Sequence, residues 1–257
     1  GHTKDNRLGV FARRPAPIQV TWLGYPNTTG LAAMDYRIVD AVTDPPGIAD
    51  GLASESLVRL ARGFLCYGPP ADAPPVAPLP AAASGQVTFG SFNDLAKCND
   101  TVVAAWAEIL RAVPGARLVL KSSQFRDAET RIRLLRRFAA RGVSPERIVL
   151  KPWQAARRDH LAAYAEIDIA LDPFPYNGTT TTCEALWMGV PVVTLCGDGH
   201  AARVGASLLG AVGLDDLVTH GVGDYAAVAT ALARDLDRLT AVRRALRAGV
   251  AGSSLCD

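Results

Sequence analysis

The chain has 257 residues, of which 49% are hydrophobic and 20% charged, and its formal net charge is +2. This is the composition of an ordinary globular protein, and so small a net charge provides no general attraction for nucleic acid or an anionic membrane. No apolar run approaches the roughly 18 to 20 residues that a membrane-spanning helix needs. The first residues show neither a signal-peptide pattern nor an initiator methionine. We therefore expect a fragment or internal domain of a cytoplasmic protein.

The cysteines also restrict the class of protein. They are odd in number, widely scattered and without a CxxC pair: Cys66, Cys98, Cys183, Cys196 and Cys256. This spacing argues against a disulfide scaffold and against a zinc site, and a reducing cytoplasm is the simplest setting.

The first part of the chain, residues 1–65, is interrupted by proline and glycine. It contains two short strand-like runs, 18–23 and 36–42, and a segment, 54–64, that could form a helix. Residues 66–86 are dense in proline and alanine, which favours an extended linker rather than a helix or a central strand. We expect residues 1–65 to be part of an N-terminal lobe.

From residue 87 onward, strand-like runs alternate with amphipathic helical segments. The strand candidates are short β-branched apolar runs at 87–92, 117–121, 147–150, 167–172 and 191–195. The helix candidates lie at 101–113, 128–142, 157–166 and 181–189, with more in the tail, such as 224–239. This alternation predicts an α/β lobe, residues 87–257, built on a parallel sheet with right-handed crossovers.

Ligands of such sheets bind beyond the carboxyl ends of the strands. Segments with polar side chains follow three of the expected strands, at 93–97, 173–182 and 196–205. We therefore expect three strand ends to converge on one binding rim.

The threonine run that follows Gly178 is the most unusual feature of this rim. Four threonines, Thr179 to Thr182, precede a helical segment, although threonine is a poor helix former. Free N–H groups and hydroxyls at a helix start could hold a phosphate, or the run could be an over-supplied helix cap. One cap needs only one threonine, which favours the anion site. Glu184 could stabilise the helix start or accept hydrogen bonds from sugar hydroxyls.

Other candidate residues are weaker on their own. Lys97, just after a strand end, could neutralise a departing phosphate or be an ordinary surface lysine, and the same holds for Lys121 and Arg203. His160 and His200 are equally ambiguous. The sequence has no P-loop lysine motif, no GxSxG elbow and no metal-ligand spacing, so metal-free phosphate binding is the remaining interpretation.

Together, the longer motifs resemble the catalytic region of the protein O-GlcNAc transferase family. They lie at residues 14–30, 34–40, 89–97, 168–195 and 200–209, and the details of 24–31, 90–97 and 174–184 are most similar to the SPINDLY-like branch. The resemblance runs from about residue 2 to the end. It implies a GT-B-type glycosyltransferase with two Rossmann-like lobes, a nucleotide held mainly by the C-terminal lobe, inversion at the sugar and no catalytic metal.

The resemblance also implies roles for individual residues. Lys97 matches the lysine that stabilises the donor diphosphate, and Thr180 and Thr181 match the pair at the helix start that holds the phosphates. Glu184 matches the acidic position at the nucleotide ribose. His160 matches a histidine near the base.

Five further residues complete the expected site. Gly178 and Arg157 belong to the expected donor-binding set. Asp94 stands where relatives often have glutamine or asparagine, and Thr179 stands where animal O-GlcNAc transferases have histidine, so donor recognition could differ at both positions. His2 is a candidate proton acceptor or sugar contact.

The resemblance predicts transfer of a sugar from a nucleotide donor to Ser/Thr hydroxyls, without a cofactor. UDP-GlcNAc is the default donor, and the SPINDLY-like details make GDP-fucose the alternative. The expected partner is a protein acceptor presented by upstream helical repeats, which this chain lacks, as it lacks the intervening domain of the animal enzymes; nucleic acid and membrane are not expected partners. The rival hypotheses are a nucleotide-sugar-binding module without turnover and a glycosyltransferase acting on a small molecule or glycan.

Overall fold

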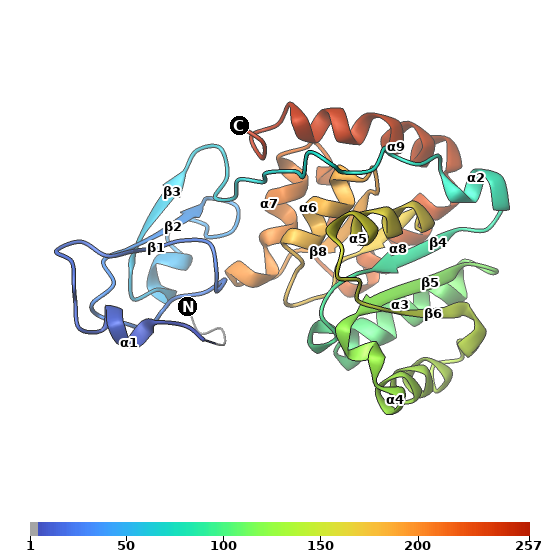
Figure 1. The fold of residues 1–257 in the computed structure, drawn as a ribbon, viewed down its shortest axis with the longest axis horizontal. Helices are drawn as coiled ribbons and strands as arrows, with labels where there is room; N and C mark the ends of the chain where they lie inside the picture. The colour runs from blue at the N-terminus through green and yellow to red at the C-terminus, as the bar shows by residue number, and fades with distance from the viewer. Residues whose placement is uncertain (1–4) are drawn as a thin grey trace.

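The computed structural model describes residues 5–257, which form two parallel sheets of unequal size joined by a long connection (Figure 1). The smaller sheet has the order β1-β2-β3, with β1 (Val20–Thr21), β2 (Tyr36–Asp40) and β3 (Ser56–Leu60). Two short helices accompany it, α1 (Leu8–Phe11) and the 3₁₀ segment η1 (Ala49–Leu52).

The prediction of a helix at 54–64 is wrong, because this segment contains strand β3. Ser56 pairs with Tyr36 and Leu60 with Asp40, so the segment is hydrogen-bonded in parallel register along the whole of β2. Its residues alternate between exposed and half-buried, as on a strand with one covered face. Pairing with β2 therefore overrides the local helical preference.

The larger sheet has the order β6-β5-β4-β7-β8-β9, and all its strand pairs are parallel. Its strands are β4 (Thr88–Ser91), β5 (Arg117–Ser122), β6 (Ile148–Pro152), β7 (Ile169–Leu171), β8 (Val192–Leu195) and β9 (Val218–Thr219). The chain begins at the centre with β4, builds outward through β5 and β6, and returns to β7 on the other side of β4. The strand order therefore reverses between β4 and β7, where open α/β sheets bind their ligands.

Helices connect the strands of this sheet and end the chain. They are α3 (Asp100–Ala112), α4 (Ala128–Ala139), α5 (Arg157–Ala162), α6 (Thr180–Trp187), α7 (Val204–Gly210), α8 (Val222–Arg234) and α9 (Leu236–Ala251). Short 3₁₀ segments lie between them: η2 (Leu95–Lys97), η3 (Ser123–Arg126), η4 (Pro145–Arg147), η5 (Ala163–Glu166), η6 (His200–Ala202) and η7 (Asp215–Leu217). The single run expected at 224–239 is two helices, because the chain breaks at Asp235. Within residues 5–257, no helix combines the length and apolar character needed to cross a bilayer.

The proline-rich connection is not wholly extended. Residues Pro80–Ser84 form the short helix α2, although the proline-rich sequence predicts no helix in this connection. Proline is tolerated in the first helical turn, since its missing N–H would have no helical partner there, and Gly85 ends the helix at φ 68°. The Ala81 N–H donates to the buried Asp168 carboxylate at 2.9 Å, which attaches the connection to the larger sheet.

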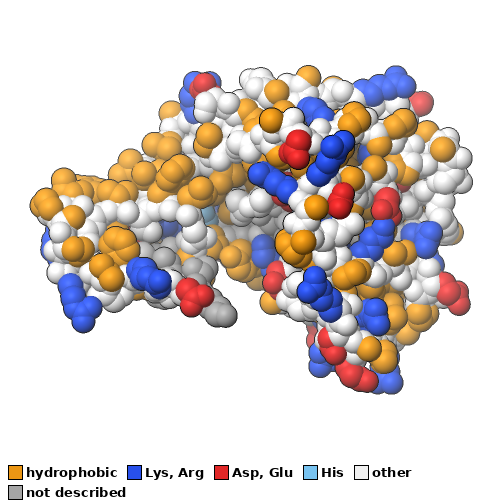
Figure 2. All heavy atoms as spheres, in the orientation of Figure 1, with side chains coloured by type: hydrophobic (Ala, Val, Ile, Leu, Met, Phe, Trp, Pro, Cys, Tyr) orange, Lys and Arg blue, Asp and Glu red, His pale blue; other side chains and the backbone are white. Residues whose placement is uncertain are grey.

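Buried polar contacts join the two parts of the molecule. The Ser207 hydroxyl of α7 donates to Asp40 at the end of β2 (2.6 Å), and His200 Nδ1 lies 2.5 Å from Asp44 Oδ2. In the space-filling view, hydrophobic side chains gather over the small sheet, and the surface is hollowed where the two parts meet (Figure 2).

Candidate functional site

The loops after β4 and β7 form the candidate site at the reversal of strand order. The first loop leads through η2, which Lys97 closes, and the second runs from residue 173 to the start of α6. Because β4 and β7 are adjacent and parallel, both loops leave the sheet at the same edge.

The amine of Lys97 lies beside the start of α6. It donates to the Asn177 carbonyl at 2.7 Å and to Asn93 Oδ1 at 3.5 Å, and it lies 4.2 Å from the centroid of the Tyr176 ring. The Thr181 hydroxyl donates to the same Asn93 oxygen at 3.0 Å. The predicted lysine and threonine are therefore neighbours. Burial lowers the pKa of Lys97, and this lowering is opposed by nearby carboxylates.

Asp172 supports this loop from below. It follows β7 and is buried, and its carboxylate accepts hydrogen bonds from the Gly178 N–H (2.6 Å) and the Thr194 hydroxyl (2.7 Å). Burial raises the pKa of Asp172 to about 7. Gly178 has no room for a side chain, because a Cβ there would lie 2.6 Å from Thr181 Oγ1 and 3.0 Å from Asn93 Oδ1. The backbone at Gly178 therefore lies close against the hydroxyl of Thr181.

The four threonines differ in what they can offer a ligand. Thr179 is the N-cap of α6, but its side chain makes no capping hydrogen bond. Thr180 is exposed and Thr181 half-buried. Thr182 is only 3% exposed, so its hydroxyl is less accessible to a ligand than those of Thr180 and Thr181. The first turn of a helix points its side chains in different directions, and one of them must face the core.

A second group of predicted residues surrounds His160. Its Nε2 lies 2.9 Å from Glu184 Oε2, and its Nδ1 lies 3.0 Å from the amine of Lys121. Lys121, which the sequence left as a ligand contact or a surface lysine, is only 2% exposed and also donates to Gln154 Oε1 at 2.7 Å. Glu184 is likewise buried, inside α6. The carboxylate expected at the ribose thus has a fixed histidine partner.

Tyr164 connects the two groups. Its hydroxyl donates to the Thr181 carbonyl at 3.1 Å, and its ring centroid lies 5.9 Å from that of His160. The Phe92 ring, after β4, packs at 4.5 Å against Tyr164. The residues expected at the phosphates and those expected at the ribose are therefore joined through the packed rings of Tyr164 and Phe92.

The remaining predicted residues are either exposed on the surface or outside the described part of the chain. Asp94 is exposed and caps η2, and its Oδ1 accepts hydrogen bonds at 2.8 Å from the Ala96 N–H and from Gln124 Nε2. Arg157 is exposed at the first position of α5. His2 lies outside the described residues, so its expected role stays a prediction.

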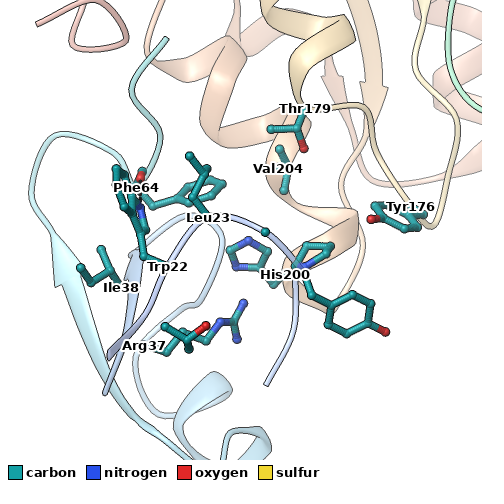
Figure 3. A pocket seen from close by; sticks show the side chains of 13 residues that line it. Trp22, Leu23, Arg37, Ile38, Phe64, Tyr176, Thr179, His200 and Val204 are labelled. Carbon is teal, nitrogen blue, oxygen red and sulfur yellow. Dashed lines mark hydrogen bonds between the residues drawn. The ribbon is translucent and has the colours of Figure 1, made fainter. Parts of the chain in front are cut away.

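A pocket lies between the two parts of the molecule (Figure 3). Tyr176 and Thr179 line it from the larger part, opposite Trp22 and Leu23 of the smaller part, and His200 lies between them. Within residues 5–257, no group of three or more His, Cys, Asp or Glu side chains is placed to hold a metal ion.

The model of glycosyl transferase family 41 matches residues 1–68 and 79–257 of the chain. The chain belongs to this family. It is 51% identical over 257 residues to a Solanum lycopersicum protein named "Probable UDP-N-acetylglucosamine--peptide N-acetylglucosaminyltransferase SPINDLY", a match that covers 100% of this chain and 28% of the relative. It is 32% identical over 270 residues to an Arabidopsis thaliana protein of the same name with the suffix SEC, covering 96% of this chain and 26% of the relative. The chain thus spans little more than a quarter of these curated relatives.

Solved structures show the same architecture. A Thermobaculum terrenum O-GlcNAc transferase mutant matches with a TM-score of 0.89 and 46% identity, covering 96% of this chain and 47% of that one. TarM of S. aureus shares the fold at a TM-score of 0.58 and 12% identity, covering 85% of this chain and 41% of that one. The expected family and the GT-B-type fold are confirmed.

Sequence reasoning missed several residues that hold the site together. Asn93 and Asn177 carry the contacts of Lys97, and Asp172 carries those of Gly178. Asp172 could have been identified, since a carboxylate at the end of a buried apolar run needs an explanation. The two asparagines gave no comparable signal.

Proposed function

We propose that the chain forms the donor-binding part of a protein O-glycosyltransferase that transfers N-acetylglucosamine from UDP-GlcNAc to Ser/Thr hydroxyls, with inversion and without a metal ion. The observation that carries this proposal is the meeting of Lys97 and Thr181 at Asn93, beside the N-terminus of α6. The names of the SPINDLY and SEC relatives, with the Thermobaculum terrenum match, support the reaction and the donor.

The proposed chemistry follows from where charge develops. The acceptor oxygen attacks the anomeric carbon from the face opposite the diphosphate, and the bond from that carbon to the phosphate oxygen breaks. Negative charge then grows on the departing diphosphate. An ammonium at Lys97, the Thr181 hydroxyl and the N–H groups at the start of α6 are suited to stabilise it. The acceptor proton passes to a base, for which His2 remains the candidate.

The residues around His160 suit the nucleoside end of the donor. A buried carboxylate such as Glu184 can accept hydrogen bonds from the two ribose hydroxyls. The edge of an imidazole beside aromatic rings can contact the nucleobase. For the whole protein we propose a cytoplasmic enzyme whose helical repeats, outside this chain, present the protein acceptor.

Thermal unfolding with UDP, GDP, UDP-GlcNAc and GDP-fucose tests the proposal. A ligand that binds only the native state raises the melting temperature by mass action, and UDP and UDP-GlcNAc are expected to do so in the presence of EDTA. Stabilisation by the guanosine compounds alone would indicate that GDP-fucose, rather than UDP-GlcNAc, is the donor. If none of the four stabilises the protein, the proposed function is wrong.

A further inference from the structure

Lys121 lies near the carboxyl end of β5, and its amine is next to the ring of His160. It belongs to β5, and the whole residue is 2% exposed. Its amine donates to Gln154 Oε1 at 2.7 Å, contacts His160 Nδ1 at 3.0 Å and lies 5.3 Å from the Phe92 ring centroid. Of these three neighbours, His160 links the amine to Glu184, the carboxylate expected at the nucleoside.

The chemistry of the three groups fixes the position of the imidazole proton. An ammonium can only donate, so Nδ1 of His160 must accept from Lys121. The ring proton is then on Nε2, which lies 2.9 Å from Glu184 Oε2 and donates to it. Nδ1–H would instead point a second donor at the ammonium and leave the Glu184 carboxylate without its partner.

A buried ammonium is costly, which makes a purely packing role for Lys121 a poor explanation. Burial lowers the pKa of Lys121 to about 8, although the carboxylates of Glu184, Glu166 and Asp159 act to raise it and Lys151 acts to lower it. An apolar side chain of similar length would fill the same space without this cost. The amine is therefore best explained by what it does to His160.

We propose that Lys121 is a positioning residue of the donor site: its amine holds Nδ1 of His160, fixes the proton on Nε2, and thereby orients the Glu184 carboxylate for the nucleoside. This inference rests on the proposed function for its ligand, but the arrangement of the three side chains exists without one. It separates the nucleoside end of the site, which depends on Lys121, from the diphosphate end, which depends on Lys97 and Thr181.

Lys151 provides a matched control. It pairs with Lys121 in the register of β5 and β6, and its amine binds the carboxylate of Glu166 rather than the ring of His160. Lys151→Met and Lys121→Met remove the same charge from adjacent strands.

The first readout is ¹⁵N NMR of the imidazoles in the unliganded protein. The chain has four histidines, so a His160→Gln variant assigns the signals of His160. We expect the Nε2–H tautomer in the wild type and in Lys151→Met, and a mixture of tautomers in Lys121→Met. An unchanged Nε2–H tautomer in Lys121→Met would overturn the proposal, whether or not any nucleotide binds.

The second readout is the affinity for UDP, GDP and inorganic pyrophosphate, measured by calorimetry. Lys121→Met is expected to lower the affinity for the bound nucleotide about tenfold and to leave the affinity for pyrophosphate unchanged. Lys121→Arg is expected to restore part of the lost nucleotide affinity. Equal weakening of nucleotide and pyrophosphate would indicate general damage to the site and contradict a positioning role. If the wild type binds neither nucleotide, the proposed function fails, and the imidazole spectra alone decide whether Lys121 positions His160.

Discussion

The amine of Lys97 and the hydroxyl of Thr181 meet at one acceptor, Asn93 Oδ1, at distances of 3.5 and 3.0 Å. Lys97 follows β4 and Thr181 lies in the first turn of α6, after β7, so the contact joins two distant parts of the sequence. Both groups can supply hydrogen bonds to an anion, and Asn93 holds them side by side. A diphosphate that binds between them gains the charge of the amine and the N–H groups of the helix start.

The tight backbone at Gly178 predicts a strong effect of a single methyl group. In Gly178→Ala the new Cβ would collide with Thr181 Oγ1 and Asn93 Oδ1, so these groups must move. We expect nucleoside diphosphate affinity to fall at least tenfold, since the donors of the site lose their alignment. Calorimetric titration measures this effect.

Gly223→Ala is the control for that experiment. Gly223 lies in α8, and a Cβ there meets nothing within 4 Å. Alanine should stabilise the helix by about 0.5–1 kcal/mol and leave nucleotide affinity unchanged. Unaltered affinity in both variants would contradict the placement of the diphosphate at Gly178.

The buried Asp172 predicts an unusual pH dependence of stability. Burial raises its pKa from 3.8 to about 7, so the native state binds the proton more tightly than the unfolded chain does. The stability gained from the protonated group is present at low pH and is lost as the pH rises through 7. The free energy of unfolding of the wild type, relative to Asp172→Asn, should therefore fall by about 2–4 kcal/mol between pH 4 and pH 8.

Denaturant titrations at these two pH values measure that difference. Exposed Asp224 provides the control variant Asp224→Asn, whose difference from the wild type should be small at both pH values. A wild type that loses no stability relative to Asp172→Asn on this rise in pH would show that Asp172 ionises normally.

The contact between His200 and Asp44 predicts acid-sensitive attachment of the small sheet. Burial alone would raise the pKa of Asp44, but the hydrogen bond and charge of His200, together with Arg37, outweigh it and hold the pKa below its ordinary value. This stabilisation is present above about pH 4 and is lost as the pH falls through the native pKa. His200→Ala should lower the free energy of unfolding by about 1–3 kcal/mol at neutral pH, and by less in acid.

Chemical denaturation at pH 7 and pH 3 tests this prediction. The exposed His220 provides the control variant His220→Ala, which should unfold like the wild type. A loss in His200→Ala that stays constant over this range would mean that the contact contributes packing but no charge interaction.

The central strands could be predicted from the sequence because their apolar residues are contiguous. The run at 167–172 contains β7 and that at 191–195 contains β8, since strands buried on both faces need no alternation. The segment 54–64 could not be assigned in this way. Its strand depends on pairing with β2, which no local pattern records.

The site shows the same division. Glycine and threonine after a strand are local signals, and they indicated Gly178 and Thr181, whereas the role of Lys97 came from the family resemblance. The partners that hold them, Asn93 and Asp172, act through tertiary contacts that follow from strand order rather than from spacing along the chain. The burial of Thr182 could not be predicted from the run of threonines, because the inward face of a single helical turn depends on the position of the sheet behind it.

We propose that Lys97 and the start of α6 hold a nucleoside diphosphate without a divalent cation. Calorimetric titration of UDP and GDP, with EDTA present, into the wild type, Lys97→Ala and Lys97→Arg tests it most directly. We expect saturable binding of one nucleotide to the wild type, at least tenfold weaker binding to Lys97→Ala, and intermediate binding to Lys97→Arg. Equal affinity in the wild type and Lys97→Ala, or binding only when Mg²⁺ replaces EDTA, would contradict it.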